Sequence, residues 1–350
     1  MVWLNSRCCA LAAVLACWQV AVVFPANAWA QGVPEASPLS TFHLPADGQV
    51  GEPPVVVSIA LSSDGRLAAA AGDDHLVHLW DMTDGRLIRT LRGHFDWVRS
   101  VAFSPDGRQL ASTGNDRRIM LWEIPSGRLI RTIVDHSEAV CSLSYSPDGR
   151  ILASVGYDRQ MRLFDGKTGN LVRLLDCPGS EMRTVVFSPD SQRVAATGRN
   201  GHLRVWDTAT ANVVFEHTTD SRRMRALAFS ADGAKLAVAG DGNRITILNA
   251  ATGAELLSLA GHPGRIMSLA FCGPNRLAAG GSDNLIRIWN LDSQAEELRL
   301  VGHKGSVSSL AQHPVTGLMI SGSFDTTLRV WALDGRGNAT TRAVGPTRLK

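Results

Sequence analysis

Short runs of apolar residues alternate with turn residues along most of the chain, and each run has the length of a β-strand. Residues 98–133 illustrate the pattern: four runs, each of four to six residues, are separated by turn sequences such as Pro105-Asp106-Gly107 and Pro125-Ser126-Gly127. The runs are 98–103, 110–113, 119–122 and 129–133. No long stretch has the apolar period of a helix. The pattern predicts four antiparallel strands in about forty residues.

This four-strand pattern repeats along the chain. The third run of each unit ends on an apolar residue, in order Trp80, Trp122, Phe164, Trp206, Leu248, Trp289 and Trp331, with a step of 42 residues throughout except for 41 between the fifth and sixth. Six residues before each of them stand Asp74, Asp116, Asp158, Asn200, Gly242, Asp283 and Asp325. A four-stranded unit at this period is the signature of a propeller blade.

The repeat therefore predicts an all-β fold, a seven-bladed β-propeller of four-stranded antiparallel blades. An isolated four-stranded sheet leaves both of its faces exposed to solvent, whereas neighbouring blades in a ring bury each other's faces. A fourth strand follows each of the first six units but not the unit that ends at Trp331. An unpaired edge would leave the ring open, so we expect residues 40–44 to supply the missing strand and close the last blade.

The recurring dipeptides resemble those of the WD-repeat family. Gly-His pairs stand at 93–94, 261–262 and 302–303, and Trp-Asp pairs stand at 80–81 and 206–207. The resemblance covers roughly residues 41–334. It implies a propeller scaffold that binds a protein or peptide partner, and not an enzyme.

The resemblance also implies a structural hydrogen-bond chain of His, Ser, Asp and Trp within a blade. The two complete sets are His94, Ser112, Asp116 and Trp122, and His303, Ser321, Asp325 and Trp331. A third set, His136, Ser154, Asp158 and Phe164, lacks the indole donor. The fifth unit departs most from the family pattern, because Leu248 replaces Trp, Gly242 replaces the turn Asp and Asp220 stands where His is usual. We expect that blade to be the weakest.

The ends of the chain have a different pattern from the repeats. Arg7 precedes the apolar stretch 8–24, and Ala28-Trp29-Ala30 fits a small-x-small cleavage site, which is typical of an export signal. We expect a signal peptide over 1–30, a linker over 31–40, the propeller over 41–334 and a flexible tail over 335–350. The protein would then be periplasmic or extracellular after cleavage near Ala30.

Other interpretations of the N-terminus stay open. The apolar stretch is short for a membrane span, yet an uncleaved signal would act as an anchor, and only then do we expect membrane contact. Cys17 lies in a loose lipoprotein-like cleavage sequence. A misread start site would make the protein cytoplasmic.

The charge balance and the cysteine content bear on nucleic-acid binding and on disulfide bonds. The chain carries 35 Lys and Arg against 32 Asp and Glu, so no general basic field points to nucleic acid. Removal of the signal would leave Cys141, Cys177 and Cys272. Three thiols form no complete disulfide framework, although a bridge between Cys141 and Cys177 is open alongside three free thiols.

The resemblance further implies that partners contact three positions per blade on one rim. The expected partner-binding residues are Trp97, Arg99, Tyr157, Arg183, Arg199, Arg223, Arg225, Arg265 and Phe324. Arginines at these positions in units four to six (183, 199, 223, 225 and 265) form an arc suited to an acidic peptide. The alternative is that they pair internally with Glu181, Asp220 and Asp241.

Catalytic motifs are not found in the sequence. It contains no Gly-x-Ser-x-Gly elbow and no phosphate loop. We expect no catalytic residues, no metal site and no cofactor. The alternative function is a hydrolase-like propeller enzyme with its active site in the central channel, which a cluster of carboxylates and histidines there would favour.

Overall fold

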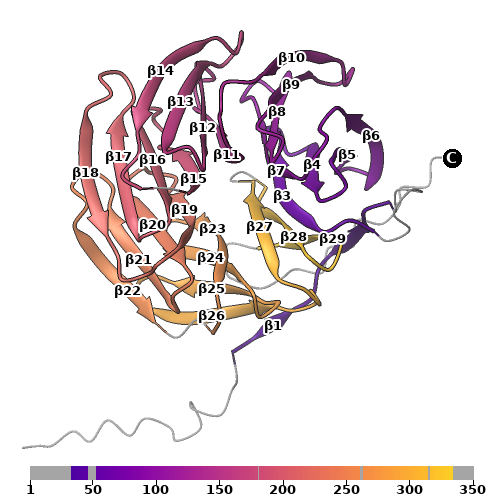
Figure 1. The fold of residues 1–350 in the computed structure, drawn as a ribbon. Coiled ribbons are helices and arrows are strands. Elements are labelled where there is room, and N and C mark those ends of the chain that lie inside the picture. Colours follow the sequence, from indigo (N-terminus) through magenta and orange to yellow (C-terminus); the bar gives the residue numbers. More distant parts are fainter. Residues whose placement is uncertain (1–32, 46–52, 180, 261–262, 314–315, 334–350) are drawn as a thin grey trace, which may run out of the picture. The chain divides into compact units, whose positions relative to one another are not determined.

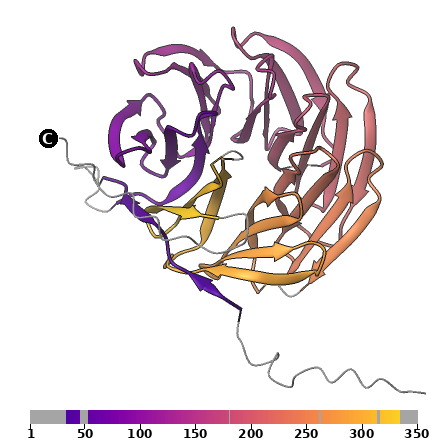
Figure 2. The same ribbon diagram turned by 180° about the vertical axis from the view of Figure 1, so that it is seen from behind.

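Seven antiparallel sheets surround a central channel in the computed structural model (Figure 1). The structure describes residues 33–45, 53–179, 181–260, 263–313 and 316–333. Each sheet is one blade, and the view from behind shows the same radial arrangement (Figure 2). The prediction of seven four-stranded blades is confirmed.

Equivalent strands of successive blades are spaced along the chain by the repeat of about 42 residues. The innermost strands are β3 (Val56–Leu61), β7 (Val98–Phe103), β11 (Val140–Tyr145), β15 (Met182–Phe187), β19 (Met224–Phe229), β23 (Ile266–Gly273) and β27 (Val307–Gln312). The second strands are β4 (Leu67–Gly72), β8 (Gln109–Gly114), β12 (Ile151–Gly156), β16 (Arg193–Gly198), β20 (Lys235–Gly240), β24 (Arg276–Gly281) and β28 (Leu318–Ser323). We number the blades one to seven in this order.

The third and fourth strands complete each blade toward the outside. The third strands are β5 (Leu76–Asp81), β9 (Ile119–Glu123), β13 (Gln160–Asp165), β17 (His202–Asp207), β21 (Arg244–Asn249), β25 (Ile286–Asn290) and β29 (Thr327–Ala332). The fourth strands of blades one to six are β6 (Arg86–Arg92), β10 (Leu129–Ile133), β14 (Leu171–Asp176), β18 (Val213–Thr218), β22 (Glu255–Ala260) and β26 (Ala295–Leu300).

The fourth strand of blade seven comes from the N-terminal part of the chain, as the sequence predicts. Strand β2 (Ser40–His43) pairs antiparallel with β29, from Ser40 opposite Val330 to His43 opposite Thr327. The ring of Phe42 stacks on Trp80 of blade one, with 5.7 Å between the ring centroids. The N-terminal strand therefore joins the last blade to the first.

The segment predicted as a linker, 31–40, has more structure than expected. Strand β1 (Glu35–Ala36) pairs in parallel with β26 and adds a fifth strand to blade six. Val301 donates its backbone N–H to the carbonyl of Ala36 at 2.9 Å. No sequence pattern indicates this strand, because a two-residue strand has no detectable alternation and is stabilised by the open edge it pairs with.

The hydrophobic core lies between neighbouring blades. One cluster joins Val77 and Leu79 of blade one to Phe103 and Trp122 of blade two, and its members are buried. Another joins blades seven and one through residues such as Ile320 and Val56. The ring is thus closed by the same type of packing that holds every other pair of blades, and small residues on the second strands allow the sheets to approach closely.

Several sequence-based predictions fall outside the described residues. They are the signal peptide at 1–30, the tail at 335–350 and the Gly261-His262 pair. Across the ranges that the structure describes, no helix has the length and apolar character needed for a membrane span.

Candidate binding surface at the channel mouth

A β-bulge at the start of each innermost strand directs one side chain into the channel. In blade two, Val98 pairs with Gly114 and Ser100 pairs with Thr113, so Arg99 is the extra residue. The same shift in register occurs in every blade. Bulges reorient the side chain at the irregular position. The seven bulge residues are Val57, Arg99, Cys141, Arg183, Arg225, Met267 and Ser308, and all of them line the channel cavity.

The cavity has a volume of about 320 Å³. One position deeper, hydroxyl side chains connect the blades: Ser58 accepts the backbone N–H of Val101 at 3.2 Å, and Ser100 accepts that of Leu143 at 3.1 Å. The other serines of this belt are Ser142, Ser268 and Ser309. The channel lining thus includes this serine belt and Cys141 besides arginines and aliphatic residues. Among the described lining residues no carboxylate or histidine faces the channel.

Backbone hydrogen bonds bring the predicted rim positions together within each blade. Asn115 donates its N–H to the carbonyl of Trp97 at 3.0 Å, and Tyr157 donates to Ala139 at 3.0 Å. The equivalent bonds in other blades link Arg199 to Glu181, Asp241 to Arg223, Ser282 to Arg265 and Phe324 to Ser306. Glycine precedes most of these turn residues because the approach is close: a Cβ on Gly114 would lie 2.0 Å from the Trp97 carbonyl oxygen. All the predicted partner-binding positions therefore lie at one end of the channel.

Part of the arginine arc is paired internally. Arg199 forms an ion pair with Glu181, whose other oxygen lies 3.5 Å from the Nη2 of Arg183. Arg225 donates from Nε to Asp241 at 2.5 Å. These pairs match the alternative in which the arc neutralises itself.

The rest of the arc is not paired in this way. Within the described residues, Arg223 and Arg265 have no carboxylate within 4.0 Å, and Asp220 has no cationic partner. Arg265 is exposed and Arg223 is half-buried. Pairing therefore accounts for three of the five predicted arginines and leaves positive charge at the channel mouth.

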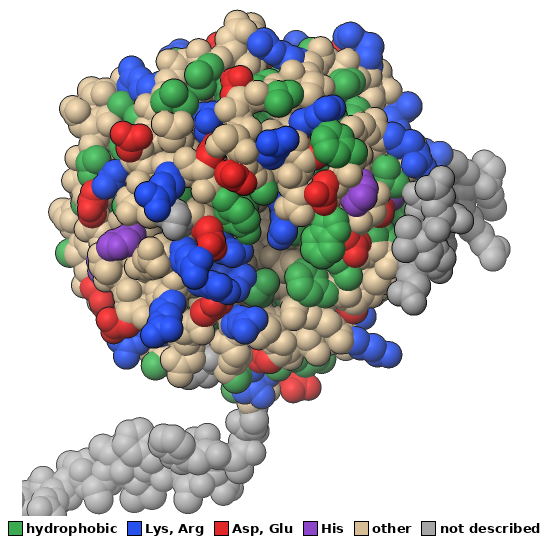
Figure 3. All heavy atoms as spheres, viewed as in Figure 1, with side chains coloured by type: hydrophobic (Ala, Val, Ile, Leu, Met, Phe, Trp, Pro, Cys, Tyr) green, Lys and Arg blue, Asp and Glu red, His purple; other side chains and the backbone are tan. Residues whose placement is uncertain are grey.

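Aromatic side chains flank the same opening. Trp97 and Phe324 are 40% and 42% exposed. The guanidinium of Arg99 lies 5.4 Å from the centroid of the Trp97 ring, and that of Arg183 lies 5.8 Å from the centroid of the Tyr157 ring. Figure 3 shows a central hollow on this face, with Lys and Arg side chains gathered over β19 and β23 and hydrophobic side chains over β3.

Burial and charge shift the pKa values of groups at the channel mouth. Burial raises the pKa of the Cys141 thiol, and the charge of Arg99 opposes that effect. Burial also raises the pKa of Tyr157. The carboxyl of Glu181 has a lowered pKa, because its hydrogen bond to Arg199 and the charges of its arginine neighbours outweigh desolvation. Glu181 is therefore ionised at neutral pH, and Cys141 and Tyr157 are neutral.

The predicted structural network is hydrogen-bonded in two blades. In blade two, the Nδ1 of His94 donates to Asp116 at 2.7 Å, its Nε2 lies 2.8 Å from the Ser112 hydroxyl, and Trp122 donates its indole N–H to that hydroxyl at 2.8 Å. Blade seven has the equivalent bonds among His303, Ser321, Asp325 and Trp331. These groups are buried and do not line the channel cavity, so each network holds the strands of one blade together.

Blade three has no indole to donate to Ser154, and a cation pairs with the carboxylate of its network. His136 bonds Asp158 at 2.8 Å and Ser154 at 2.7 Å, while Arg162 donates to Asp158 at 2.7 Å. Phe164 is fully buried. Sequence reasoning found the loss of the indole but not the arginine, although Arg162 lies two residues before Phe164 and therefore on the same face of β13.

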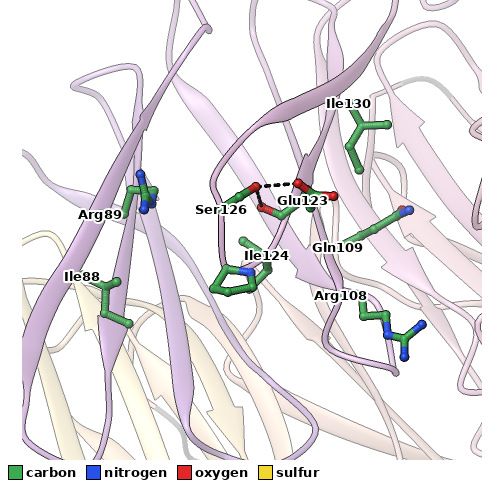
Figure 4. Close-up of a pocket in the computed structure, with 9 residues that line it drawn as sticks. Ile88, Arg89, Arg108, Gln109, Glu123, Ile124, Ser126 and Ile130 are labelled. Atoms are coloured by element: carbon green, nitrogen blue, oxygen red, sulfur yellow. Dashed lines mark hydrogen bonds between the residues drawn. The ribbon is translucent and has the colours of Figure 1, made fainter.

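The largest cavity, about 930 Å³, lies away from the channel, between the outer strands of blades one and two (Figure 4). Two of its polar residues bond to each other, because Ser126 donates to Glu123 at 2.7 Å, whereas the Oε1 of Gln109 is buried without a partner among the described residues. No polar groups converge on a common point there, so the channel mouth is the stronger candidate for a binding surface.

Other chemistry is limited in the described part of the chain. Cys141, Cys177 and Cys272 are free thiols, so the bridge between Cys141 and Cys177 does not form. Burial raises the pKa of both Cys177 and Cys272 to about 12. No three His, Cys, Asp or Glu side chains of the described residues come together as a metal site.

Comparison with known proteins gives the family. The family described as "WD domain, G-beta repeat" matches six segments that together cover more than half of the chain: 40–81, 85–123, 127–165, 169–207, 253–290 and 295–332. The chain belongs to the WD-repeat family. The matched segments leave out 208–252, which contains β19, β20 and β21 of blade five, the blade whose sequence departs most from the WD-repeat pattern.

A short part of the chain is also similar to part of a protein that is described as a kinase. The chain is 46% identical over 44 residues to the "Probable serine/threonine-protein kinase PkwA" of Thermomonospora curvata. The match covers 13% of this chain and 6% of that protein, about the length of one WD repeat. WD-repeat propellers are generally non-catalytic scaffolds that bind proteins or peptides.

Proposed function

We propose that this WD-repeat protein is an exported scaffold that binds an acidic peptide segment of a partner protein at the channel mouth. The observation that carries the proposal is the uncompensated charge on that rim. Arg223 and Arg265 have no carboxylate partner among the described residues, and Trp97 and Phe324 provide exposed rings nearby. Arginine forks pair with carboxylates and aromatic rings act as anchors at interfaces.

The proposal is tested with a defined acidic probe. Fluorescence anisotropy measures binding of labelled hexaglutamate to the wild-type protein and to a variant carrying Arg199→Glu, Arg223→Glu and Arg265→Glu. We expect the variant to lose about tenfold or more in affinity, because three positive charges at the rim become negative and repel the probe. Binding by the wild type should also weaken as salt screens the charges.

A matched control separates a local effect from net charge. The control variant carries Arg86→Glu, Arg89→Glu and Arg128→Glu on the exposed outer strands, so its net charge changes by the same amount. It should bind hexaglutamate nearly as well as the wild type. Equal loss in both variants, or no binding by the wild type, would remove the basis for the proposal.

Export is the second part of the proposal and rests on the N-terminal sequence pattern. N-terminal sequencing of the protein recovered from the exported fraction of a bacterial host should begin at Gln31, directly after the Ala28-Trp29-Ala30 motif. A chain that begins at Met1 would indicate a retained anchor or a cytoplasmic protein, according to the fraction in which it is found. A chain that begins at Cys17 would indicate a lipoprotein.

A further inference from the structure

Two arginines approach one sector of the channel from opposite sides of blade three. Arg99 belongs to blade two and Arg183 to blade four, and both are bulge residues that line the channel cavity together with Cys141 of blade three. The charges of both arginines act on Cys141 and on Tyr157. Both guanidinium groups therefore lie close to the part of the channel wall that blade three supplies.

Neither of these charges is fully compensated. The Nε of Arg99 donates to a neutral amide, the Asn115 Oδ1, at 2.8 Å, and Arg99 has no carboxylate within 4.0 Å among the described residues. Arg183 shares Glu181 with Arg199, and its own Nε is buried without an acceptor among the residues that the structure describes. The third arginine at a bulge position, Arg225, is different because Asp241 neutralises it.

We propose that the sector bounded by Arg99, Arg183 and Tyr157 is a site for one carboxylate, occupied by an Asp or Glu side chain of the bound peptide. This inference rests on the proposed function and adds the point at which the peptide enters the channel. The outer arginines Arg223 and Arg265 attract the acidic segment, and the channel sector holds one of its carboxylates.

The chemistry of the sector favours a carboxylate over other groups. Guanidinium groups present planar pairs of donors that match two carboxylate oxygens, and here two such groups come from different blades. The unpaired Nε of Arg183 would gain an acceptor, which removes the cost of a buried donor without a partner. The channel cavity, which has a volume of about 320 Å³ and is lined by strands of all seven blades, has room for an acidic side chain.

Cys141 gives a direct readout of this site. Because its thiol lies on the cavity wall between the two arginines, an occupied site should slow its alkylation by iodoacetamide, which is uncharged. Mass spectrometry of the peptides reports Cys141, with Cys177 and Cys272 as internal references. The probes are acetyl-glutamate amide, which carries a single side-chain carboxylate, and acetyl-glutamine amide, which has the same shape without the charge.

We expect the glutamate probe to slow alkylation of Cys141 and the glutamine probe to leave the rate unchanged. The variant Arg99→Gln/Arg183→Gln should lose this protection and should bind labelled hexaglutamate about tenfold more weakly, a loss of about 1.4 kcal/mol. The control variant Arg86→Gln/Arg150→Gln removes two exposed charges outside the channel and should behave as the wild type in both measurements.

The outcomes separate this inference from the proposed function. If hexaglutamate binds the wild type and the double variant equally and Cys141 is not protected, the channel site is wrong while the rim proposal stands. If hexaglutamate does not bind the wild type, the rim proposal fails, and protection of Cys141 by the glutamate probe alone then decides the channel site. Equal protection by both probes would mean that shape and not charge is recognised, which overturns the carboxylate site.

Discussion

At the scale of single residues, the buried carboxylates of blades two and seven show how a polar chain can stabilise a propeller. Burial alone would raise the pKa of Asp116, but the hydrogen bond and charge of His94 outweigh it and hold the pKa below its ordinary value. Asp325 has the same balance with His303, and its pKa is also lowered. Both groups are therefore ionised at neutral pH and fully satisfied, which is the condition for a buried polar network to stabilise a fold.

Replacing either carboxylate should weaken the protein. We expect Asp116→Ala and Asp325→Ala each to lower the free energy of unfolding by about 1–3 kcal/mol, because the buried His and backbone donors lose their acceptor. Urea unfolding at pH 7 measures the change. The control is Asp84→Ala, in which the carboxylate is on an exposed turn and its loss should have little effect.

The effect should depend on pH in a defined direction. A carboxyl whose folded pKa is lowered stabilises the folded state above its unfolded pKa near 3.8, and this contribution is lost as the pH falls through the folded value. The difference between wild type and Asp116→Ala should therefore shrink in strong acid. A difference that is absent at pH 7 would show that the network contributes nothing to stability.

At the scale of whole elements, blade five lacks several of the contacts that hold blades two and seven. Leu248 is buried and preserves the apolar core, but the polar chain has no counterpart there. A cavity of about 370 Å³, lined by residues such as Asp220, Val238 and Gly242, occupies the corresponding region. The serine belt is also interrupted, because Ala226 stands where Ser58 and Ser100 stand in blades one and two. Missing neighbours and missing hydrogen bonds both lower local stability.

Blade five should therefore open first. In hydrogen exchange followed by mass spectrometry, we expect amides of β19–β22 to exchange before those of β7–β10. The variant Ala226→Ser restores a hydroxyl at the belt position and should slow exchange in β19 and the adjacent β23. Slower exchange in blade five than in blade two would contradict the prediction.

At the scale of the whole molecule, ring closure depends on a strand that is distant in sequence from the blade it completes. Strand β2 pairs with β29, Leu44 is buried, and Ser309 of blade seven accepts the backbone N–H of Ile59 in blade one at 3.2 Å. Losing β2 would expose the edge of β29 and the apolar side chains that β2 covers. The N-terminal segment thus stabilises the contact between the first and last blades.

Deletion of residues 31–45 should destabilise the protein strongly. We expect a loss of roughly 1.5–3 kcal/mol from the buried side chain of Leu44 alone, a further loss from the half-buried Phe42, and a corresponding fall in the thermal midpoint. Deletion of residues 336–350 is the control and should have a much smaller effect. Equal midpoints for the two truncations would mean that β2 does not close the ring energetically.

The sequence by itself determined the number of blades, their strands and the source of the closing strand, because a 42-residue period with fixed turn residues leaves few other ways to bury both faces of each sheet. It also placed the rim positions at one end of the channel. It could not reveal β1, whose two residues pair only because blade six offers an open edge, or Arg162, whose partner Asp158 is chosen by packing.

Only the tertiary structure decided which arginines are neutralised. Arg225 and Arg183 occupy the same bulge position in consecutive blades, yet one has Asp241 to itself while the other shares Glu181 with Arg199. The physical reason is that an ion pair depends on the directions of two side chains on neighbouring turns. The repeat pattern of the sequence does not specify those directions. The unpaired positive charge at the channel mouth is therefore a property that the tertiary structure decides.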